Sequence, residues 1–395
     1  MKSMSVKIKV VITVIACLVA SGVGLVALFE RSYEKSVSLA TITALNNART
    51  MFANLQSGQI EKMAVAAELV MAHPPLRQAF AENNIDHLIE INQPIFNRLK
   101  QNYGITILNY ITLDERRYLT MTTPYDLKLR GEKAIRFNVQ ECAKTKTWVN
   151  GMALGKLGFA LRVTHPFYDN GQLQGDKQIG YIELGSEIGG LLSALKQQTG
   201  NEFGLMMLKK FFKEEDWVAQ RKLLKLQNNW GDLKDILLAN NTSGKESIFN
   251  YSGDVTSLPD AGIPLDIVKS GDKQYARGAF PIRDASAAKV GALFVLVDIT
   301  EQYKSMQQMK WLAVVSVGVV IVLLCALLIT LLQKLVFGRL AKITRSATRL
   351  VGGDFDTPLE VTSEDEIGKF ESLFEQFRVV FVNVLKELEN LQGGK

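Results

Sequence analysis

The sequence predicts an α+β protein held in a membrane by two helices, and three observations support this prediction. Two runs of about twenty residues, 10–29 and 311–332, contain no charged residue. Between them, apolar and polar residues alternate over several short stretches, as in strands that are buried on one face. After the second run, apolar residues recur at intervals of three and four, the spacing of amphipathic helices. We therefore expect two spans, a large region between them and a short helical segment at the end.

The composition excludes several kinds of protein and site. A formal net charge of +6 is small for 395 residues, so we expect no nucleic-acid binder, which would concentrate basic residues in one patch. Three cysteines and three histidines, far apart in sequence, are too few for a disulfide framework or a zinc site. We also find no nucleophile and base at a catalytic spacing and no phosphate-binding loop. The sequence predicts a protein that is not an enzyme and has no metal, cofactor or nucleic-acid partner.

Each uncharged run is long enough to cross a membrane, because twenty helical residues cover the hydrocarbon core of about 30 Å. The alternative for the first run is a cleaved signal peptide. Its apolar stretch exceeds the usual 7–15 residues or so of such peptides, and its small residues lie inside the run rather than after it. We therefore expect an uncleaved anchor at 10–29 and a second span at 311–332.

Basic residues without acids flank the spans on the two sides that face the chain ends. Three lysines precede the first span, and five basic residues follow the second before the first acid: Lys2, Lys7 and Lys9, then Lys334, Arg339, Lys342, Arg345 and Arg349. The positive-inside rule then places both termini, residues 1–9 and 334–395, in the cytoplasm. Residues 30–310 form one large region on the outer side, where a ligand would bind.

The outer region starts with a long helix over 32–72, which contains no proline and ends before Pro74 and Pro75. A shorter helix over 88–101 comes next. A first, membrane-distal lobe is predicted at about 103–185, with a helix at 132–146. Its strands are expected at 105–112, 117–123, 148–152, 159–168 and 178–184. A helix at 185–198 links this lobe to a second one.

The second, membrane-proximal lobe is predicted at about 200–300. Its helices are expected at 214–226 and 233–239, and its strands at 203–208, 246–251, 274–282 and 290–298. Residues 300–310 then continue as a helix into the second span.

Polar residues on the strands of the first lobe form the candidate ligand site. Arg162 and Thr164 alternate with apolar neighbours and so share one face of their strand. We assign six further residues to the same face: Tyr110, Thr120, Thr122, Trp148, Tyr181 and Glu183. Two interpretations stay open: Arg162 binds the carboxylate of a small acid or the oxygen of an amide, or it forms an internal ion pair with Glu183, which we favour.

The first lobe also resembles a known family. Gly-Phe-Ala-Leu-Arg-Val-Thr-His-Pro-Phe-Tyr-Asp-Asn-Gly at 158–171 and Ile-Gly-Tyr-Ile-Glu-Leu-Gly at 179–185 are similar to the double-Cache sensor domains of bacterial receptors, in particular the third double-Cache type. The resemblance covers roughly 45–300. It implies two stacked PAS-like lobes on a long helix, with a small molecule bound outside the inner membrane, in the periplasm. Thr120 and Thr122 stand where we associate an arginine and a histidine with the family.

The last segment has two apolar seams separated by a turn. The first seam consists of Leu340, Ile343, Ala347 and Leu350, and the second of Ile367, Phe370, Phe374, Phe377 and Phe381. Gly352-Gly353-Asp354 and an extended connector lie between them. This arrangement resembles a HAMP relay domain over 334–384, although Arg339 stands at about the place of the usual proline. The resemblance implies a parallel homodimer in which four helices form one bundle.

These expectations combine into one function. Residues 385–395 extend the second seam as a coiled-coil stub, so we expect the output domain to be a separate or missing cytoplasmic signalling partner. The sequence predicts a bacterial membrane receptor of the chemotaxis or two-component type that senses a small ligand outside and signals through the HAMP domain. The alternative is a scaffold protein whose outer domain docks a partner protein.

The topology can be tested directly. Reporter domains fused after Gly253 and after Lys395 are expected to report opposite compartments, because the charge asymmetry places these two positions on opposite sides of the membrane. Reporters that agree would contradict the two-span arrangement.

Overall fold

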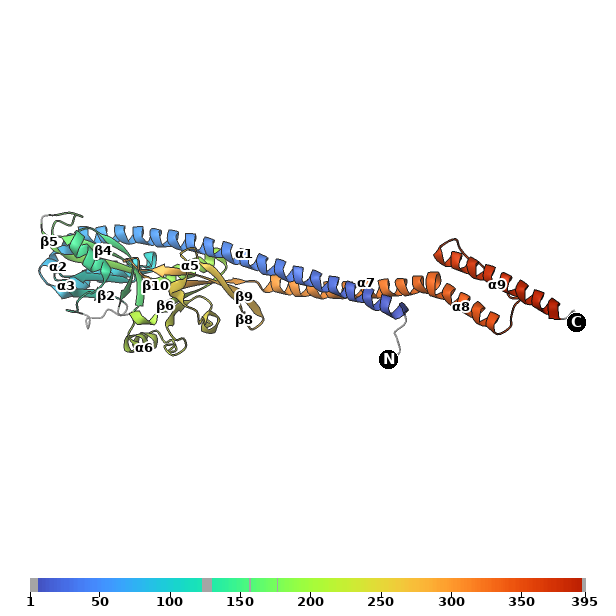
Figure 1. Ribbon diagram of the computed structural model, residues 1–395. Helices are drawn as coiled ribbons and strands as arrows, with labels where there is room; N and C mark the ends of the chain where they lie inside the picture. The colour runs from blue at the N-terminus through green and yellow to red at the C-terminus, as the bar shows by residue number, and fades with distance from the viewer. Residues whose placement is uncertain (1–5, 123–129, 156–157, 176, 393–395) are drawn as a thin grey trace. The chain divides into compact units, whose positions relative to one another are not determined.

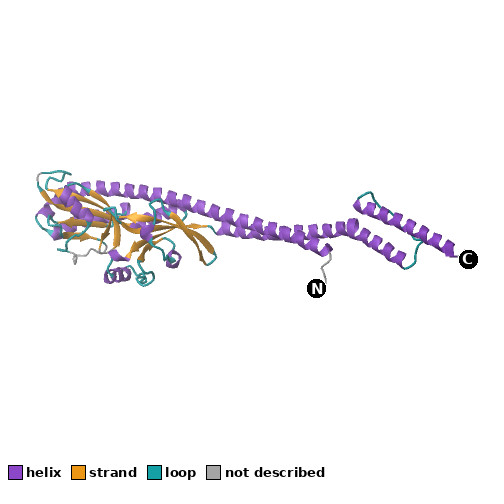
Figure 2. Cartoon of the chain, viewed as in Figure 1, coloured by secondary structure: helices purple, strands orange, loops and turns teal. Residues whose placement is uncertain are grey.

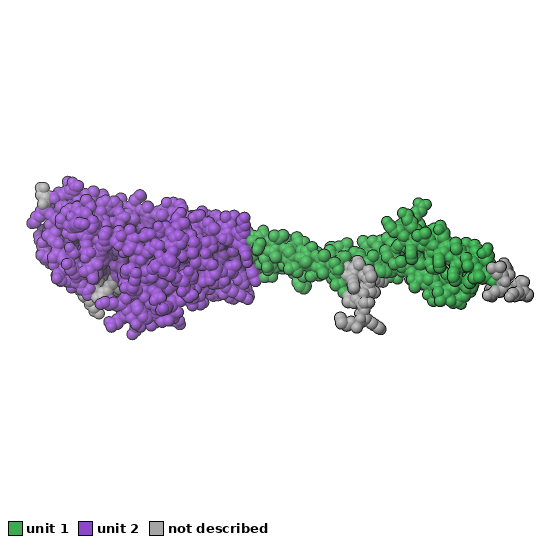
Figure 3. Space-filling model, in the orientation of Figure 1, with its two compact units in different colours: residues 1–33, 304–395 green, residues 34–303 purple. Residues whose placement is uncertain are grey.

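A computed structural model describes residues 6–122, 130–155, 158–175 and 177–392. Lys2, the end of the strand expected at 117–123 and the end of the stub lie outside these residues. The chain forms two compact units (Figure 3). We call residues 34–303 the outer unit, and residues 1–33 with 304–395 the membrane unit. All the strands of the described residues belong to the outer unit (Figure 2).

Helix α1 (Val6–Ala72) enters the outer unit and supplies one wall of its core. Leu45 contacts Gly278, and the ring of Phe52 lies 6.4 Å from that of Phe280. Helices α2 (Pro74–Ala81) and α3 (Ile85–Tyr103) come next, and Pro74 starts the new helix at the position where its missing N–H costs least. The core therefore lies between these helices and one face of each sheet (Figure 1).

The first lobe is a five-stranded antiparallel sheet in the order β2-β1-β5-β4-β3. Its strands are β1 (Ile107–Ile111), β2 (Arg117–Met121), β3 (Val149–Gly155), β4 (Gly158–Tyr168) and β5 (Gln178–Glu187). Helices α1 to α3 cover one face. Helix α4 (Phe137–Thr145) packs on the other face through Val139 and Cys142.

The second lobe repeats this topology, with the order β7-β6-β10-β9-β8. Its strands are β6 (Glu202–Leu208), β7 (Ile236–Asn241), β8 (Ile263–Ser270), β9 (Lys273–Arg283) and β10 (Lys289–Asp298). Helix α5 (Ile188–Thr199) links the lobes, and α6 (Glu214–Leu223) follows β6. Short 3₁₀ turns occupy Lys209–Phe211, Glu246–Phe249 and Val255–Ser257.

The structure corrects several predicted elements. The helix expected at 233–239 is wrong, because Ile236–Asn241 pairs with β6 as a strand. The strand expected at 246–251 is a 3₁₀ turn in which Ile248 and Phe249 are both buried. Strand β8 was not predicted; it contains Pro264 and lies at the sheet edge, where proline is tolerated. The helix expected at 132–146 is shorter and begins at Phe137.

The membrane unit contains two apolar helices. The apolar parts of α1 and of α7 (Thr300–Leu332) are long and apolar enough to cross a membrane, judged by length and composition. Lys310 and Glu30 form an ion pair. A π-helical turn (Gln333–Phe337) follows α7 and leads into α8 (Gly338–Val351).

Helices α8 and α9 (Glu366–Gln392) are joined through one arginine. Arg339 Nη1 lies 2.7 Å from Asp365 Oδ2, and its Nη2 lies 2.8 Å from Glu371 Oε2. Glu371 is only 1% exposed, and its Oε2 also accepts a hydrogen bond from Thr362 N in the connector. The arginine that replaces the usual proline therefore ties the start of α8 to α9 within one chain.

The predicted seams are only partly covered within one chain. Ile343 and Leu350 are buried, and Ala347, Ile367 and Phe374 are half-buried. Leu340, Phe370, Phe377 and Phe381 are exposed. Because exposed aromatic rows are costly in water, we expect a further apolar surface to cover these seams.

One prediction concerns His165 on β4, which is 4% exposed and stacks on Trp148 at 5.5 Å. Burial lowers the pKa of His165 to about 4. Since this value lies below that of the unfolded chain, the unfolded state takes up the proton first and stability falls as pH falls. We expect the first lobe to lose roughly 2 kcal/mol between about pH 7 and pH 5. Thermal unfolding of His165→Gln should lack this slope, and the control His87→Gln, at an exposed helix position, should keep it.

A second prediction concerns the seams. After Cys17, Cys142 and Cys325 are replaced, single cysteines along α8 and α9 in membranes should crosslink most at the seam positions, every three or four residues. Phe374→Ala should weaken the bundle by about 3–5 kcal/mol if the ring is buried between subunits. The exposed Gln376→Ala is the matched control. Arg378 is unsuitable for this purpose, because it donates to Phe355 O and Glu375. A flat crosslinking profile would contradict the prediction.

Candidate ligand-binding site

The face of the first sheet that α4 covers carries a row of polar residues. The strand register places Asn109 opposite both Thr120 and Glu183, and Glu183 opposite Thr164. Residues that face each other across antiparallel strands point to the same side, so four neighbouring strands each contribute one polar side chain. All four side chains are buried. Arg162 lies on the same side of β4.

Glu183 lies at the centre of this face and is fully buried. Arg136 donates through Nη2 to Oε2 at 2.5 Å and through Nε to Oε1 at 3.1 Å. Arg162 Nη1 donates to Oε2 at 2.8 Å, and Asn109 Nδ2 donates to it at 2.6 Å. Burial alone would raise the pKa of Glu183, but the two guanidinium groups and the amide outweigh it and lower the pKa to about 2. The favoured interpretation, an internal pair of Arg162 and Glu183, is confirmed.

Positive charge exceeds negative charge on this face. Arg117 is 8% exposed, and its partner at 3.2 Å, Glu132, has a side chain that is 41% exposed. Arg117, Arg136 and Arg162 therefore face two carboxylates, of which only Glu183 is fully buried. Burial, opposed by Glu183, lowers the pKa of Arg162 to about 10, so the group remains charged at neutral pH. One positive charge is left over among the described residues.

Several buried polar atoms of this face have no hydrogen-bond partner among the described residues. They are Asn109 Oδ1, Thr120 Oγ1, Arg162 Nε, Thr164 Oγ1 and both amide atoms of Asn138 on α4. Each such atom costs about 1–3 kcal/mol when it stays unpaired, and buried polar atoms normally find a partner. The described part of the second lobe has none of them. Donors and acceptors are both represented, so a bound molecule with both kinds of group would satisfy them.

The predicted site residues divide between the two faces. Thr120, Arg162, Thr164, Tyr181 and Glu183 lie on the polar side, where Tyr181 packs on Val139 and Cys142. Thr122 comes directly after β2 and is half-buried.

Two of the residues assigned to this face lie elsewhere. Tyr110 lies on the opposite face, where its hydroxyl donates to Asn92 Oδ1 at 2.9 Å and its ring lies 5.4 Å from that of Phe80. Trp148 precedes β3 and stacks on His165, which alternates with Thr164 and so points the other way. Both corrections have the same physical reason: the side-chain period of a strand is two, so an error of one residue in the assumed register between strands moves a residue to the other face.

Sequence reasoning missed four residues of the site: Asn109, Arg117, Arg136 and Asn138. Asn109 and Arg117 stand on the predicted strands and could have been found by the same alternation. Arg136 precedes α4 and Asn138 lies in its first turn. Neither belongs to a strand. Arg136 reaches Glu183 only because α4 packs on the sheet, and Asn138 is buried on the same helix.

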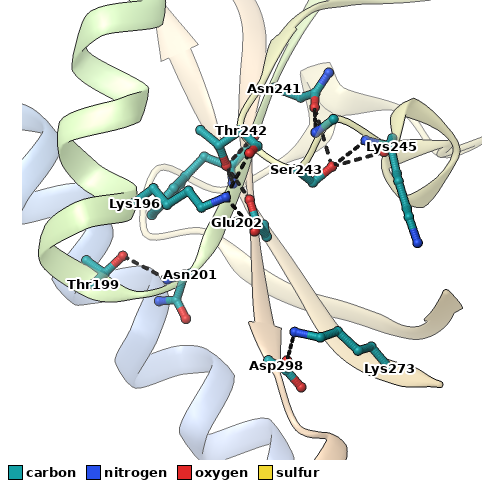
Figure 4. A network of polar contacts seen from close by, with 12 residues as sticks. Lys196, Thr199, Asn201, Glu202, Asn241, Thr242, Ser243, Lys245, Lys273 and Asp298 are labelled. Atoms are coloured by element: carbon teal, nitrogen blue, oxygen red, sulfur yellow. Dashed lines mark hydrogen bonds and ion pairs between the residues drawn. The ribbon is translucent and has the colours of Figure 1, made fainter. Parts of the chain in front are cut away.

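The polar contacts of the second lobe are satisfied and lie elsewhere (Figure 4). Lys196 of α5 pairs with Glu202 at 2.8 Å, and Glu202 accepts a hydrogen bond from Thr242 at 2.6 Å. The face that corresponds to the polar face is lined mostly by apolar side chains, among them Met206 and Phe294, and its buried Arg277 pairs with Asp266 at 2.6 Å. These contacts hold the second lobe together and leave no comparable set of unpaired groups among its described residues.

Comparison with known proteins agrees with this architecture. A family model described as the double sensory domain of two-component sensor kinases matches residues 38–303, and the HAMP domain model matches residues 331–375. A search of the curated proteins returned no match.

Solved structures include three sensor domains that resemble parts of the chain at low identity. The Escherichia coli DcuS sensor domain is 21% identical, with 37% of this chain and 98% of that chain covered and a TM-score of 0.30. The periplasmic domain of Vibrio cholerae LuxQ is 12% identical, with 66% and 99% covered and a TM-score of 0.35. The ligand-binding domain of the Campylobacter jejuni chemoreceptor Tlp3, solved with L-valine, is 11% identical, with 69% and 96% covered and a TM-score of 0.35.

The double sensory model alone covers about two thirds of the chain, from α1 to the start of α7. The two lobes, the two apolar helices and the HAMP segment all fit a receptor that carries a signal across a membrane. This chain therefore belongs to the double-Cache family of membrane sensors, with a HAMP domain after its second apolar helix.

Proposed function

We propose that this receptor binds a small polar ligand on the α4-covered face of its first lobe. The unpaired buried atoms of Asn109, Thr120, Asn138, Arg162 and Thr164 carry this proposal. A folded lobe that keeps several such atoms unpaired gives up stability, and a ligand that pairs with them returns it on binding. Thr122, Tyr181 and Glu183 complete the proposed site.

The charge of the site indicates the chemistry of the ligand. The surplus positive charge favours a ligand with an acidic group, which would accept from Arg162 Nε and Asn138 Nδ2. Glu183 already occupies Nη1 of Arg162, so such a group meets one edge of the guanidinium only. The unpaired oxygens of Asn109 and Asn138 call for a donor elsewhere on the molecule. A small acid that also carries an N–H or O–H group suits the site better than a simple amide.

We further propose the arrangement in the membrane and the assembly. The basic flanks support cytoplasmic termini and a periplasmic region at 30–310, in the inner membrane of a bacterium. The exposed part of the seams, with Phe370, Phe377 and Phe381, supports a parallel homodimer in which a second copy covers these rings. Output then passes to a cytoplasmic signalling domain of the chemotaxis or two-component type.

Signalling requires a minimum difference between the free energies with which the ligand binds the two states of the receptor. To move a switch from 1:99 to 99:1, the ligand must favour one state by about 5.5 kcal/mol. Pairing several buried polar atoms at about 1–3 kcal/mol each can supply this amount. A site with fewer unpaired groups, such as the second lobe, would supply less.

A docking function is the second candidate, because apolar side chains are exposed near the first lobe's turns. Ile135 is 75% exposed and Leu113 is 54% exposed. A partner protein that covers them could act on the same lobe without a small ligand.

The proposal is tested by Thr164→Val, which keeps the shape of the side chain and removes only its hydroxyl. Because this hydroxyl is unpaired, we expect the free protein to become more stable by about 1 kcal/mol, while ligand binding weakens about tenfold. Thermal unfolding of the full chain in nanodiscs measures both effects, first without additives and then with a panel of small hydroxy acids, amino acids and their amides.

The matched control is Thr242→Val in the second lobe, whose hydroxyl accepts from Phe203 N and donates to Glu202. It should lower stability and leave binding unchanged. If Thr164→Val destabilises the protein as much as Thr242→Val does, or if compounds that stabilise the wild type act equally on it, the proposed site is wrong.

A further inference from the structure

Besides α1 and the connecting helix α5, the two lobes meet at a small contact between a strand edge and a turn. Ala285 N, in the turn between β9 and β10, donates to Met152 O of β3 at 2.8 Å. Strand β3 is the edge strand of the first sheet, so its outer carbonyl is free of sheet pairing and can accept from the second lobe. A backbone hydrogen bond therefore joins the two sheets.

The residue before Met152 is Gly151, and its backbone conformation allows this contact. Gly151 has a φ of +138°, which side chains other than glycine rarely adopt, and an added Cβ would lie 2.9 Å from the Cβ of Ala285. Only glycine lets the turn approach so closely. Gly151 also pairs directly with Arg162 of β4. The turn of the second lobe therefore contacts β3 directly opposite Arg162, the arginine of the proposed ligand site.

The turn itself is held in one conformation. Asp284 Oδ1 accepts from Ser286 N at 2.9 Å and from Ala288 N at 3.0 Å, and Asp284 O accepts from Ala287 N at 3.0 Å. These bonds form a β-turn with Ala285 in its second position. A displacement of Ala285 is thus passed to both strands of the hairpin rather than absorbed by the turn.

The other end of the hairpin holds the first residue of α7. Lys273 at the start of β9 pairs with Asp298 at the end of β10 at 2.9 Å (Figure 4). Asp298 Oδ1 accepts from Thr300 N at 3.0 Å, and Thr300 Oγ1 accepts from Gln274 N at 3.0 Å. The hairpin therefore joins the edge of the first lobe to the N-terminus of the helix that becomes the second apolar span.

We propose that the contact of Gly151 and Met152 with Ala285 couples the polar face of the first lobe to the start of α7. The part of this coupling that involves a ligand rests on the proposed function. The series of contacts from β3 through the β9–β10 hairpin to α7 does not depend on it. The β9–β10 hairpin is paired along nearly its whole length, so it moves as one body. A shift of β4 under Arg162 moves β3, then Ala285, and then Thr300.

The test removes a single N–H group. Ala285→Pro deletes the donor to Met152, and proline is favoured in the second position of such a turn, so the hairpin should still fold. Ala287→Gly is the matched control in the same turn, since Ala287 has a φ of +65° that glycine adopts more readily. It leaves the N–H of Ala285 in place.

The polar face of the first lobe can be perturbed by substitutions, without a ligand. Glu183→Gln removes the central negative charge beside Arg162, and Thr164→Val serves as a second perturbation that keeps the lobe folded. The readout is amide hydrogen exchange of the segment 299–304 in the full chain in nanodiscs. In the wild type and in Ala287→Gly, each perturbation should change the exchange rate of this segment about threefold or more, within the range known for coupled sites.

In Ala285→Pro the same perturbations should change the exchange rate of segment 299–304 by less than about 1.5-fold. The effects of the two substitutions would then not add, and this failure to add measures the coupling through the contact. Equal responses in Ala285→Pro and the wild type would overturn the proposal and leave α5 or α1 as the route. A wild type that shows no response would also overturn it, while the binding test with Thr164→Val would still decide the proposed function independently.

Discussion

The buried carboxylate of Glu183 is the interaction on which the first lobe depends. It joins β5 to β1 through Asn109, to β4 through Arg162 and to the segment before α4 through Arg136. Removing one partner of such a buried pair leaves an uncompensated charge and costs about 3–5 kcal/mol. The sheet and its covering helix are therefore held in register by electrostatics on one face and by the apolar core on the other.

The two lobes have the same topology but differ on the sheet face that points away from the shared core. Both sheets pack one face on the helices of the shared core. On the other face, the second lobe holds apolar side chains such as Phe249 and Phe294 and one buried arginine, Arg277, that is paired with Asp266, whereas the first lobe holds unpaired polar atoms. A fully paired filling gives rigidity, and an incompletely paired polar face gives an interaction that a ligand can complete. Under the proposed function, the same fold provides a sensing lobe and a transmitting lobe.

Each junction along the chain is held by a small number of charged or backbone contacts. The turn at Ala285 meets the edge of β3, Asp298 holds the first residue of α7, and Arg339 joins α8 to α9 through Asp365 and Glu371. Such contacts have defined geometry and can be made or broken as units. They suit a receptor whose lobes and helices must shift between discrete arrangements rather than deform gradually.

The sequence by itself determined the parts of the structure that have a local period. The uncharged runs, the seams of α8 and α9 and most strands arise from the spacing of apolar residues, since burial acts on each helix or strand separately. Tertiary structure decided the rest. Residues 236–241 have a helical spacing but pair with β6, because sheet pairing outweighs local preference. The strand register placed Tyr110 on the apolar face, and only the packing of α4 brought Arg136 to Glu183. A contact such as Gly151 with Ala285 joins residues over a hundred positions apart, and no local pattern encodes it.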